Sequence, residues 1–190
     1  MKFEIIKFNK VDSTNDKAIS LIRNKKKECG CISTIEQTKG RGTRGQKWIS
    51  TIGNLFTTIF FPLKKKYPTF DEFSIINPII ISKVLEKFCR KEKISFKWPN
   101  DIFVADKKIC GILQEVITFN KKKFIIIGIG INIVSNPKIK GKYEATNIFS
   151  QSKKTPDINE IVKLLLIEYE SFFDNLGKYN FINYRNKLMQ

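Results

Sequence analysis

Residues 109–133 read ICGILQEVITFNKKKFIIIGIGINI, and the predicted sheet is built around this stretch. Its two halves, residues 109–119 and 124–133, are rich in Ile, Val, Phe and Thr, which are typical of β-strands. Between them lies a short polar turn that contains Asn120-Lys121-Lys122. Because so short a connection joins strands that run in opposite directions, the stretch predicts an antiparallel hairpin.

Further strands are expected on both sides of this hairpin. Residues 94–97 and 102–104 are short apolar runs, and a turn at residues 105–107 leads from the second run into the hairpin. Three earlier segments have the same strand-like composition, at residues 2–8, 31–36 and 54–61. Together these runs predict a mixed, mainly antiparallel sheet.

Capping residues and the helical spacing of apolar residues predict helices between these strands. Asp12-Ser13-Thr14-Asn15 is an N-cap cluster that opens the first helix. A second helix is expected over residues 71–91, in which Pro78 marks either a kink or the first turn.

The last third of the chain combines an irregular segment with two helices. Residues 137–155 are polar and are expected to be irregular. Asp157-Ile158-Asn159-Glu160 resembles a capping box and opens a long amphipathic helix to about Leu176, and a shorter helix runs toward Gln190. The sequence therefore predicts one α+β domain over residues 1–190, with helices packed on the sheet.

The composition is that of a globular protein with a large positive charge. Hydrophobic residues make up 42% of the 190 positions, which suffices for a sizeable core. A net charge of +17 is typical of proteins that bind nucleic acids, but the lysines are spread over nearly every segment. We therefore expect no specific nucleic acid partner, although a diffuse positive charge attracts acidic proteins.

The cysteine and histidine content excludes several kinds of site. The four cysteines, at 29, 31, 89 and 110, have no CxxC spacing, and the chain contains no histidine. This pattern disfavours zinc sites and a disulfide framework, and it excludes catalysis by Ser-His-Asp or Cys-His groups. No leader segment and no apolar run of the ~18 residues of a membrane helix are visible. We expect a cytoplasmic protein without membrane contact.

Residues 40–48, GRGTRGQKW, form the first candidate site. Three glycines allow the backbone to fold closely around an anion and to present its N–H groups. Arg41 and Arg44 are two of only five arginines in a chain with 30 lysines, which indicates that the bidentate geometry of the guanidinium is needed here. The loop therefore predicts an anion-binding flap, and a solvated basic loop is the alternative.

Two further motifs lie at the ends of predicted elements. Ser13, Thr14 and Asn15 offer polar groups at a helix N-terminus, where free donors can bind a small polar ligand, but a helix cap explains them equally well. Gln37, just before the flap, is ambiguous in the same way. Lys97-Trp98-Pro99-Asn100-Asp101 joins two strands, where sites are often built, and a tight turn with a buried Trp is the alternative.

The central hairpin carries the remaining candidates. Lys108 enters a strand among apolar neighbours, where a lysine would stabilise a developing negative charge, and Gly111 permits close backbone approach. The alternative is an edge-strand lysine that discourages aggregation. Cys110 lacks a base and is interpreted as a core residue. Gly128-Ile129-Gly130-Ile131-Asn132 would let a ligand lie against the backbone beside the Asn132 amide, but it is no dinucleotide fingerprint.

In their order and spacing, these motifs resemble the catalytic domain of biotin protein ligases. The resemblance covers about residues 3–188 and rests on STN at 13–15, Gln37, GRGTRGQKW at 40–48, KWPND at 97–101, KKICGIL at 107–113 and GIGIN at 128–132. It implies the class II synthetase-like α+β fold of that domain. It also implies ATP-dependent attachment of biotin, through biotinyl-5′-AMP, to a lysine of a biotin carboxyl carrier domain.

The resemblance also implies roles for individual residues. In catalysis, Lys108 and Arg41 neutralise the reacting anions together with Mg²⁺ carried by ATP, and Asp101 lines the reaction centre. The implied biotin-binding residues are Ser13, Thr14, Asn15, Gln37, Gly40, Arg41, Gly42, Lys108 and Gly111. The implied nucleotide-binding residues are Arg44, Trp48, Asn100 and Asn132. No protein ligand to the metal is implied.

The chain departs from the family pattern in three ways. The family usually has arginine where this chain has Thr43, so we expect a weaker hold on the adenylate. We expect that the small β-barrel domain that commonly follows the catalytic domain is missing after Gln190 and that no winged-helix domain precedes Met1. We therefore expect a catalytic domain alone, without the repressor role of some relatives.

The sequence leaves other functions open. A lipoate ligase is similar in fold and also uses a lysine, although KWPND and the GRG flap favour biotin. An octanoyl transferase would need Cys110 as its nucleophile. A nucleic-acid-binding domain and a ligase relic that only binds biotin are further alternatives, and a homodimer is neither indicated nor excluded.

Overall fold

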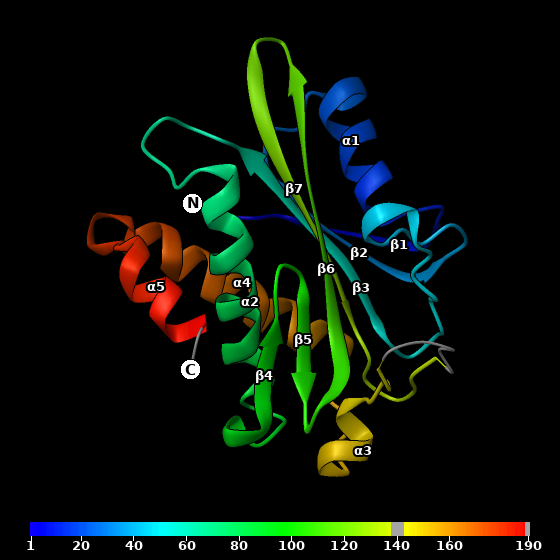
Figure 1. Cartoon of the computed structure of the whole chain (residues 1–190). Helices are drawn as coiled ribbons and strands as arrows, with labels where there is room; N and C mark the ends of the chain where they lie inside the picture. Colours follow the sequence, from blue (N-terminus) through cyan, green and yellow to red (C-terminus); the bar gives the residue numbers. More distant parts are fainter. Residues whose placement is uncertain (138–142, 189–190) are drawn as a thin grey trace.

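The computed structural model describes residues 1–137 and 143–188 of the chain. Its centre is a seven-stranded sheet in the order β1-β2-β3-β7-β6-β5-β4 (Figure 1). The strands are β1 (Ile5–Val11), β2 (Gly30–Gln37), β3 (Leu55–Pro62), β4 (Ile94–Lys97), β5 (Asp101–Val104), β6 (Lys107–Phe119) and β7 (Lys122–Ile131). β1 and β2 run parallel, and the other neighbouring pairs run antiparallel. The predicted mixed, mainly antiparallel sheet is confirmed.

Two tight turns fix the hairpins on either side of β6. Ala105 and Asp106, between β5 and β6, have φ of 49° and 60°, and Asn120 and Lys121, between β6 and β7, have φ of 48° and 61°. Positive φ at both central residues is typical of the type I′ turn, whose twist matches that of paired strands. The hairpin predicted from residues 109–133 is confirmed, and it projects far beyond the rest of the sheet (Figure 1).

Helices cover both faces of the sheet. α1 (Thr14–Lys25) packs on one face, and α2 (Phe70–Leu85), α4 (Ile158–Asp174) and α5 (Phe181–Leu188) lie together on the other (Figure 1). Successive residues of the central strands therefore contact different helices. Phe60 packs in the cluster that contains Ala18 and Ile22 of α1, whereas its neighbour Phe61 packs in the cluster that contains Phe73 of α2. Because both faces are covered, β3 and β7 are buried along most of their length rather than at alternate residues.

The second helix differs from the expected residues 71–91. Thr69 Oγ1 accepts a hydrogen bond from the Glu72 N–H (3.3 Å), and Glu72 Oε2 accepts one from the Thr69 N–H (2.7 Å), which makes a reciprocal capping box. The helix therefore begins at Phe70, and Pro78 lies inside it rather than in its first turn. Its end at Leu85 is earlier than the sequence predicted.

The expectation that residues 137–155 are irregular is wrong in one part. α3 (Ile148–Ser152) forms there because Asn147 Oδ1 accepts a hydrogen bond from the Ser150 N–H (2.7 Å). A helix of five residues is too short to produce a periodic apolar pattern, so no helix was predicted there. The rest of that prediction at residues 138–142, and the end of the last predicted helix at residues 189–190, lie outside the described residues.

Membrane-spanning helices are not found in the described parts of the chain. Every helix there is too short or too polar to cross a bilayer.

A series of buried polar side chains joins the helical layer to the sheet. The Tyr169 hydroxyl donates to Asn77 Oδ1 (2.9 Å), and Asn77 Nδ2 donates to Gln114 Oε1 (2.7 Å). Gln114 Nε2 in turn donates to the Phe70 carbonyl (2.6 Å). Burial raises the pKa of Tyr169 well above its usual value, so its hydroxyl stays protonated and remains a donor. These bonds connect α4 to α2 and α2 to β6.

The buried network predicts a stability loss for Tyr169→Phe. The substitution leaves Asn77 Oδ1 buried without its donor, which costs about 1–2 kcal/mol in the free energy of unfolding. Urea unfolding followed by circular dichroism measures this loss. Tyr67→Phe is the matched control, because the Tyr67 hydroxyl takes no part in this network. Equal unfolding midpoints for the wild type and Tyr169→Phe would contradict the prediction.

Candidate active site

A cavity of about 610 Å³ opens beside the start of β6 and the end of β7. The start of α1 and the loop that follows β2 complete its wall. The size is typical of a site for a small molecule, since such cavities usually measure about 300–1,000 Å³. Most of the predicted site residues line it, namely Ser13, Thr14, Asn15, Gln37, Arg41, Gly42, Trp48, Asn100, Asp101, Lys108, Gly111 and Asn132.

Two predicted site residues lie outside this lining. Gly40 is buried, and a Cβ there would come within 2.5 Å of the Trp48 carbonyl oxygen, so glycine is needed for the loop itself rather than for a ligand. Arg44 is exposed and has a φ of 54°, inside the 3₁₀ turn of Thr43–Gly45. The structure therefore places neither residue at the cavity surface.

The loop of residues 40–48, called the flap below, is a hydrogen-bonded turn. The Gly42 N–H donates to the Gln46 carbonyl (2.7 Å), and the Trp48 N–H donates to the Gly40 carbonyl (2.9 Å). These bonds join its two sides and place Trp48 at its end.

Trp48 packs on a bare part of the sheet. A Cβ on Gly111 would lie 2.5 Å from Trp48 Cζ3, and a Cβ on Gly130 would lie 2.4 Å from Trp48 Cε2. Likewise, a Cβ on Gly128 would lie 2.4 Å from Asn15 Oδ1. The glycines that the sequence assigned to a ligand therefore accommodate the protein's own side chains. The indole Nε1 is buried without a hydrogen-bond partner among the described residues and lies against Gly130.

The start of α1 holds its polar groups through Gln37. Ser13 Oγ caps the helix by accepting a hydrogen bond from the Asp16 N–H (3.4 Å). The Thr14 N–H and hydroxyl both donate to Gln37 Oε1 (2.8 and 3.1 Å), and Gln37 Nε2 donates to Ser50 Oγ (3.0 Å). The helix-cap interpretation of Ser13 is therefore correct, and the same group also faces the cavity.

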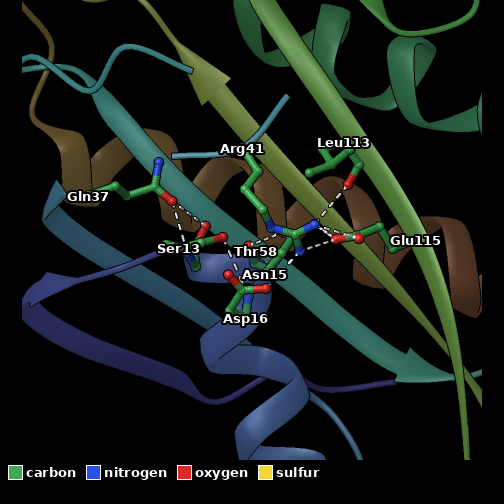
Figure 2. Close-up of polar contacts among 9 residues, drawn as sticks. Ser13, Asn15, Asp16, Gln37, Arg41, Thr58, Leu113 and Glu115 are labelled. Atoms are coloured by element: carbon green, nitrogen blue, oxygen red, sulfur yellow. Dashed lines mark hydrogen bonds and ion pairs between the residues drawn. The ribbon is translucent and has the colours of Figure 1, made fainter. Parts of the chain in front are cut away.

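Arg41 contacts carboxylates of the protein itself. Its Nη1 and Nη2 donate to the two oxygens of Glu115 (2.9 and 2.7 Å), and Nη2 also lies 2.8 Å from Asp16 Oδ1 (Figure 2). Burial lowers the pKa of Arg41, but the hydrogen bonds and charges of Glu115 and Asp16 outweigh this effect and raise it overall. The bidentate geometry expected of this arginine is thus directed at an internal partner.

Lys108 supplies the most enclosed positive charge of the cavity. Its Nζ lies 2.7 Å from Asp101 Oδ1, and the two side chains are only 13% and 11% exposed. The same ammonium lies 5.6 Å from the centre of the Trp48 ring and 5.4 Å from that of Tyr143. Since β6 lies between β5 and β7, the alternative of an edge-strand lysine is wrong.

A β-bulge turns Lys108 toward the cavity. Ile102 of β5 pairs with Cys110, but the next residue, Phe103, pairs with Lys108, so Ile109 is the extra residue of β6. Ile109 and Cys110 are both fully buried in the core. Residues three apart on a regular strand face opposite sides, and the bulge therefore brings Lys108 to the same side as Gly111.

The amides at the far wall contact the protein backbone and the flap. Asn132 is 2% exposed and its Nδ2 donates to the Thr146 carbonyl (2.9 Å). Asn100 Nδ2 donates to Thr43 Oγ1 of the flap (3.3 Å). Trp98 is 67% exposed, so the alternative of a turn with a buried Trp is wrong.

A comparison with family models gives one match that covers most of the chain. Residues 7–132 match the Biotin/lipoate A/B protein ligase family. The chain belongs to this family. The match includes the flap, Lys108, Asp101 and Asn132.

Individual members of the biotin/lipoate ligase family agree with this assignment. The bifunctional ligase/repressor BirA of Escherichia coli is 36% identical over 125 residues, which is 65% of this chain but only 38% of BirA. The structure of the biotin protein ligase of Aquifex aeolicus in complex with biotin and ATP superposes with a TM-score of 0.80 at 28% identity, covering 97% of this chain and 76% of that one. The Leishmania major ligase in complex with biotinyl-5-AMP gives 0.82 at 27% identity, covering 98% and 81%.

Three residues of this biotin/lipoate ligase family member were not found from the sequence. Glu115 and Asp16 hold Arg41, and Tyr143 lies over Lys108. Glu115 had a usable signal, because the strand period of two places it on the same face as Gly111. Asp16 is explained as a first-turn helix residue, and Tyr143 lies in a segment with no pattern.

Cys110 does not have the properties of a nucleophile in this family member. The thiol is fully buried, and burial strongly raises its pKa, with the nearby charge of Asp101 acting in the same direction. A protonated, enclosed thiol cannot attack a substrate. The octanoyl transferase alternative is therefore disfavoured.

The packing of Trp48 predicts the effect of Gly130→Ala. The added methyl group would lie 2.4 Å from the indole and must displace it, so Trp48 can no longer pack on the sheet. In a Trp98→Phe background, which leaves Trp48 as the only tryptophan, we expect red-shifted fluorescence and increased quenching by acrylamide. Gly177→Ala is the control, because a Cβ at Gly177 meets no described atom within 4 Å. An unchanged Trp48 spectrum in Gly130→Ala would disprove this packing role.

Proposed function

We propose that this protein ligates biotin to a lysine of a biotin carboxyl carrier domain, with ATP as the second substrate and biotinyl-5′-AMP as the intermediate. The observation that carries the proposal is the position of Lys108, a largely enclosed ammonium in a cavity that the flap and Trp48 border. Family membership and the biotin-, ATP- and biotinyl-5-AMP-bound neighbours support it.

The first step requires two anions to approach each other. A carboxylate oxygen of biotin attacks the α-phosphorus of ATP, and pyrophosphate leaves. Lys108 is proposed to contact both the carboxylate and the α-phosphate and to offset their repulsion. Asp101 holds Lys108 in place through the 2.7 Å ion pair. Mg²⁺ is proposed to enter as a complex with ATP and to neutralise charge on the phosphates.

Binding of the two substrates is divided between the two ends of the cavity. Ser13, Thr14 and Gln37 lie together at the start of α1 and offer the hydrogen-bonding groups that a ureido ring needs. Trp48 and Asn132 line the same cavity, and we assign them to the nucleotide. The aromatic ring of Trp48 suits a stacked ligand.

The second step transfers the biotinyl group to an acceptor. The uncharged ε-amine of the acceptor lysine attacks the carbonyl carbon of biotinyl-5′-AMP, AMP leaves, and the nitrogen loses a proton to give the amide. The acceptor must approach from outside the cavity, and the net charge of +17 would speed its encounter with an acidic domain. The 190 residues are proposed to act as the catalytic unit, although they span only 38% of BirA.

The decisive experiment is incubation of the protein with biotin, Mg-ATP and a purified biotin carboxyl carrier domain. Mass spectrometry of the carrier should show the mass increase of one biotinyl group, which requires both biotin and ATP. Replacement of biotin by lipoate tests the related substrate in the same assay. Biotin binding in calorimetry without any mass shift would reduce the protein to a binding module.

Lys108→Ala tests the assigned catalytic group. We expect the rate of biotinyl-5′-AMP formation, measured by pyrophosphate release, to fall by about 100-fold or more. A loss of this size is typical when a group that stabilises transition-state charge is removed. Because the substitution leaves Asp101 without its partner, circular dichroism must first establish that the variant is folded. Lys83→Ala, which breaks the surface pair with Glu168, is the matched control. An undiminished rate in folded Lys108→Ala would disprove the mechanism.

Thr43 predicts how firmly the intermediate is held. Its hydroxyl accepts a hydrogen bond from Asn100 but carries no charge, so position 43 lacks the cation that would help to hold the adenylate. We expect Thr43→Arg to slow the release of biotinyl-5′-AMP several-fold, as measured by rapid filtration. Thr118→Arg adds the same charge at an exposed position of β6 and serves as the control. If the wild type already releases biotinyl-5′-AMP slowly and Thr43→Arg does not change that rate, the prediction is contradicted.

A further inference from the structure

Arg41 links three elements that are far apart in the sequence. The arginine lies in the flap, Glu115 lies on β6, and Asp16 lies in the first turn of α1 (Figure 2). The guanidinium makes two hydrogen bonds to Glu115 of 2.9 and 2.7 Å and an ion pair with Asp16 of 2.8 Å. We call these three residues the clamp.

The clamp continues into the floor of the cavity through Asn15. Glu115 Oε2 also accepts a hydrogen bond from Asn15 Nδ2 (2.7 Å), and Asn15 Nδ2 donates to the Leu113 carbonyl as well (3.2 Å). Asn15 Oδ1 accepts a hydrogen bond from Thr58 Oγ1 (2.7 Å) (Figure 2). Glu115 therefore connects the flap to buried residues of α1 and β3.

The geometry of the clamp is specific to arginine. Two parallel N–H groups of one guanidinium match the two oxygens of one carboxylate, and a third N–H reaches a second carboxylate. A lysine could not make these contacts at the same time. This explains why arginine stands in the flap of a chain that otherwise prefers lysine.

Contacts to Arg41 restrain the whole flap, because Arg41 is bonded to the rest of it. Arg41 forms a bridge with Lys47 across the turn, and the adjacent Trp48 N–H donates to the Gly40 carbonyl (2.9 Å). Besides the clamp, the flap is attached to the body of the protein by the indole of Trp48 on the glycines of β6 and β7 and by the hydrogen bond from Asn100 to Thr43. Loss of the clamp removes its only ion pairs with carboxylates among the described residues.

We propose that Glu115 and Asp16 are positioning residues that keep the flap closed over the cavity by binding Arg41, and that they thereby slow the escape of the reaction intermediate. The first half of the proposal concerns the protein without ligand. The second half rests on the proposed ligase function. Neither carboxylate needs to touch the substrate.

Hydrogen exchange of the ligand-free protein tests the first half. The Gly42 and Trp48 amides report flap opening, because each is hydrogen-bonded across the turn. In Glu115→Gln we expect their exchange to accelerate about tenfold, since a hydrogen-bonded ion pair of this kind is lost. Exchange in the core strand β7 should not change, which separates local opening from general destabilisation. Glu168→Gln removes the same charge from a surface pair with Lys83 and is the control.

Asp16 offers a sharper test because Arg41 is the group with which its carboxylate pairs. Asp16→Asn should accelerate flap exchange in the wild-type background. In an Arg41→Gln background, the same substitution should add nothing, since its partner is already gone. Equal exchange in Glu115→Gln and the wild type, or an equal effect of Asp16→Asn in both backgrounds, would overturn the clamp.

Release of biotinyl-5′-AMP tests the second half. With biotin and Mg-ATP supplied, Glu115→Gln should release the intermediate about tenfold faster than the wild type. Faster flap exchange with unchanged release would overturn this half while leaving the first half intact. If the wild type forms no adenylate at all, the proposed function fails, and the exchange experiment still decides whether the clamp exists.

Discussion

The register between β6 and β7 positions both the core and the candidate active site. It places Gly111 directly opposite Gly130, so two residues without side chains form a bare patch on which the indole of Trp48 packs. On the other face, Ile112 and Ile129 belong to the main core. A shift of one residue would exchange these faces, burying the patch and exposing the isoleucines. The type I′ turn at Asn120 and Lys121 prevents such a shift.

Carboxylates hold the positive charges of the site before any ligand enters. Lys108 lies against Asp101, and Arg41 lies against Glu115 and Asp16. An enclosed ammonium without a counter-charge would be costly, and its pairing with Asp101 removes most of that cost. The pairing also fixes the direction of the charge, so little reorganisation is needed when an anionic group arrives.

Much of the fold could be predicted from local sequence alone. The hairpin of β6 and β7, the short strands β4 and β5, and the cap of α1 at Ser13 all follow from patterns within about a dozen residues. The misses have physical causes. α3 is too short for a periodic signal, and the start of α2 depends on the capping box of Thr69 and Glu72 rather than on its apolar spacing.

The candidate site was predicted as a set of motifs rather than as an arrangement. Asn15, Gln37, Trp48, Lys108 and Asn132 were recognised separately, and the fold brings them to one cavity. Their contacts did not follow from the sequence. Gly128 and Gly130 make room for Asn15 and Trp48. The guanidinium of Arg41 binds Glu115, a residue 74 positions away.

Local sequence was enough to predict the strands, most of the helices and the kinds of chemical group in the site, because propensity, capping and residue type act over short distances. Which charges pair and which way Lys108 points became known from the folded structure. Those outcomes depend on the bulge at Ile109 and on contacts between elements far apart in the chain. No local pattern encodes these pairings, because the paired residues come into contact only in the folded chain.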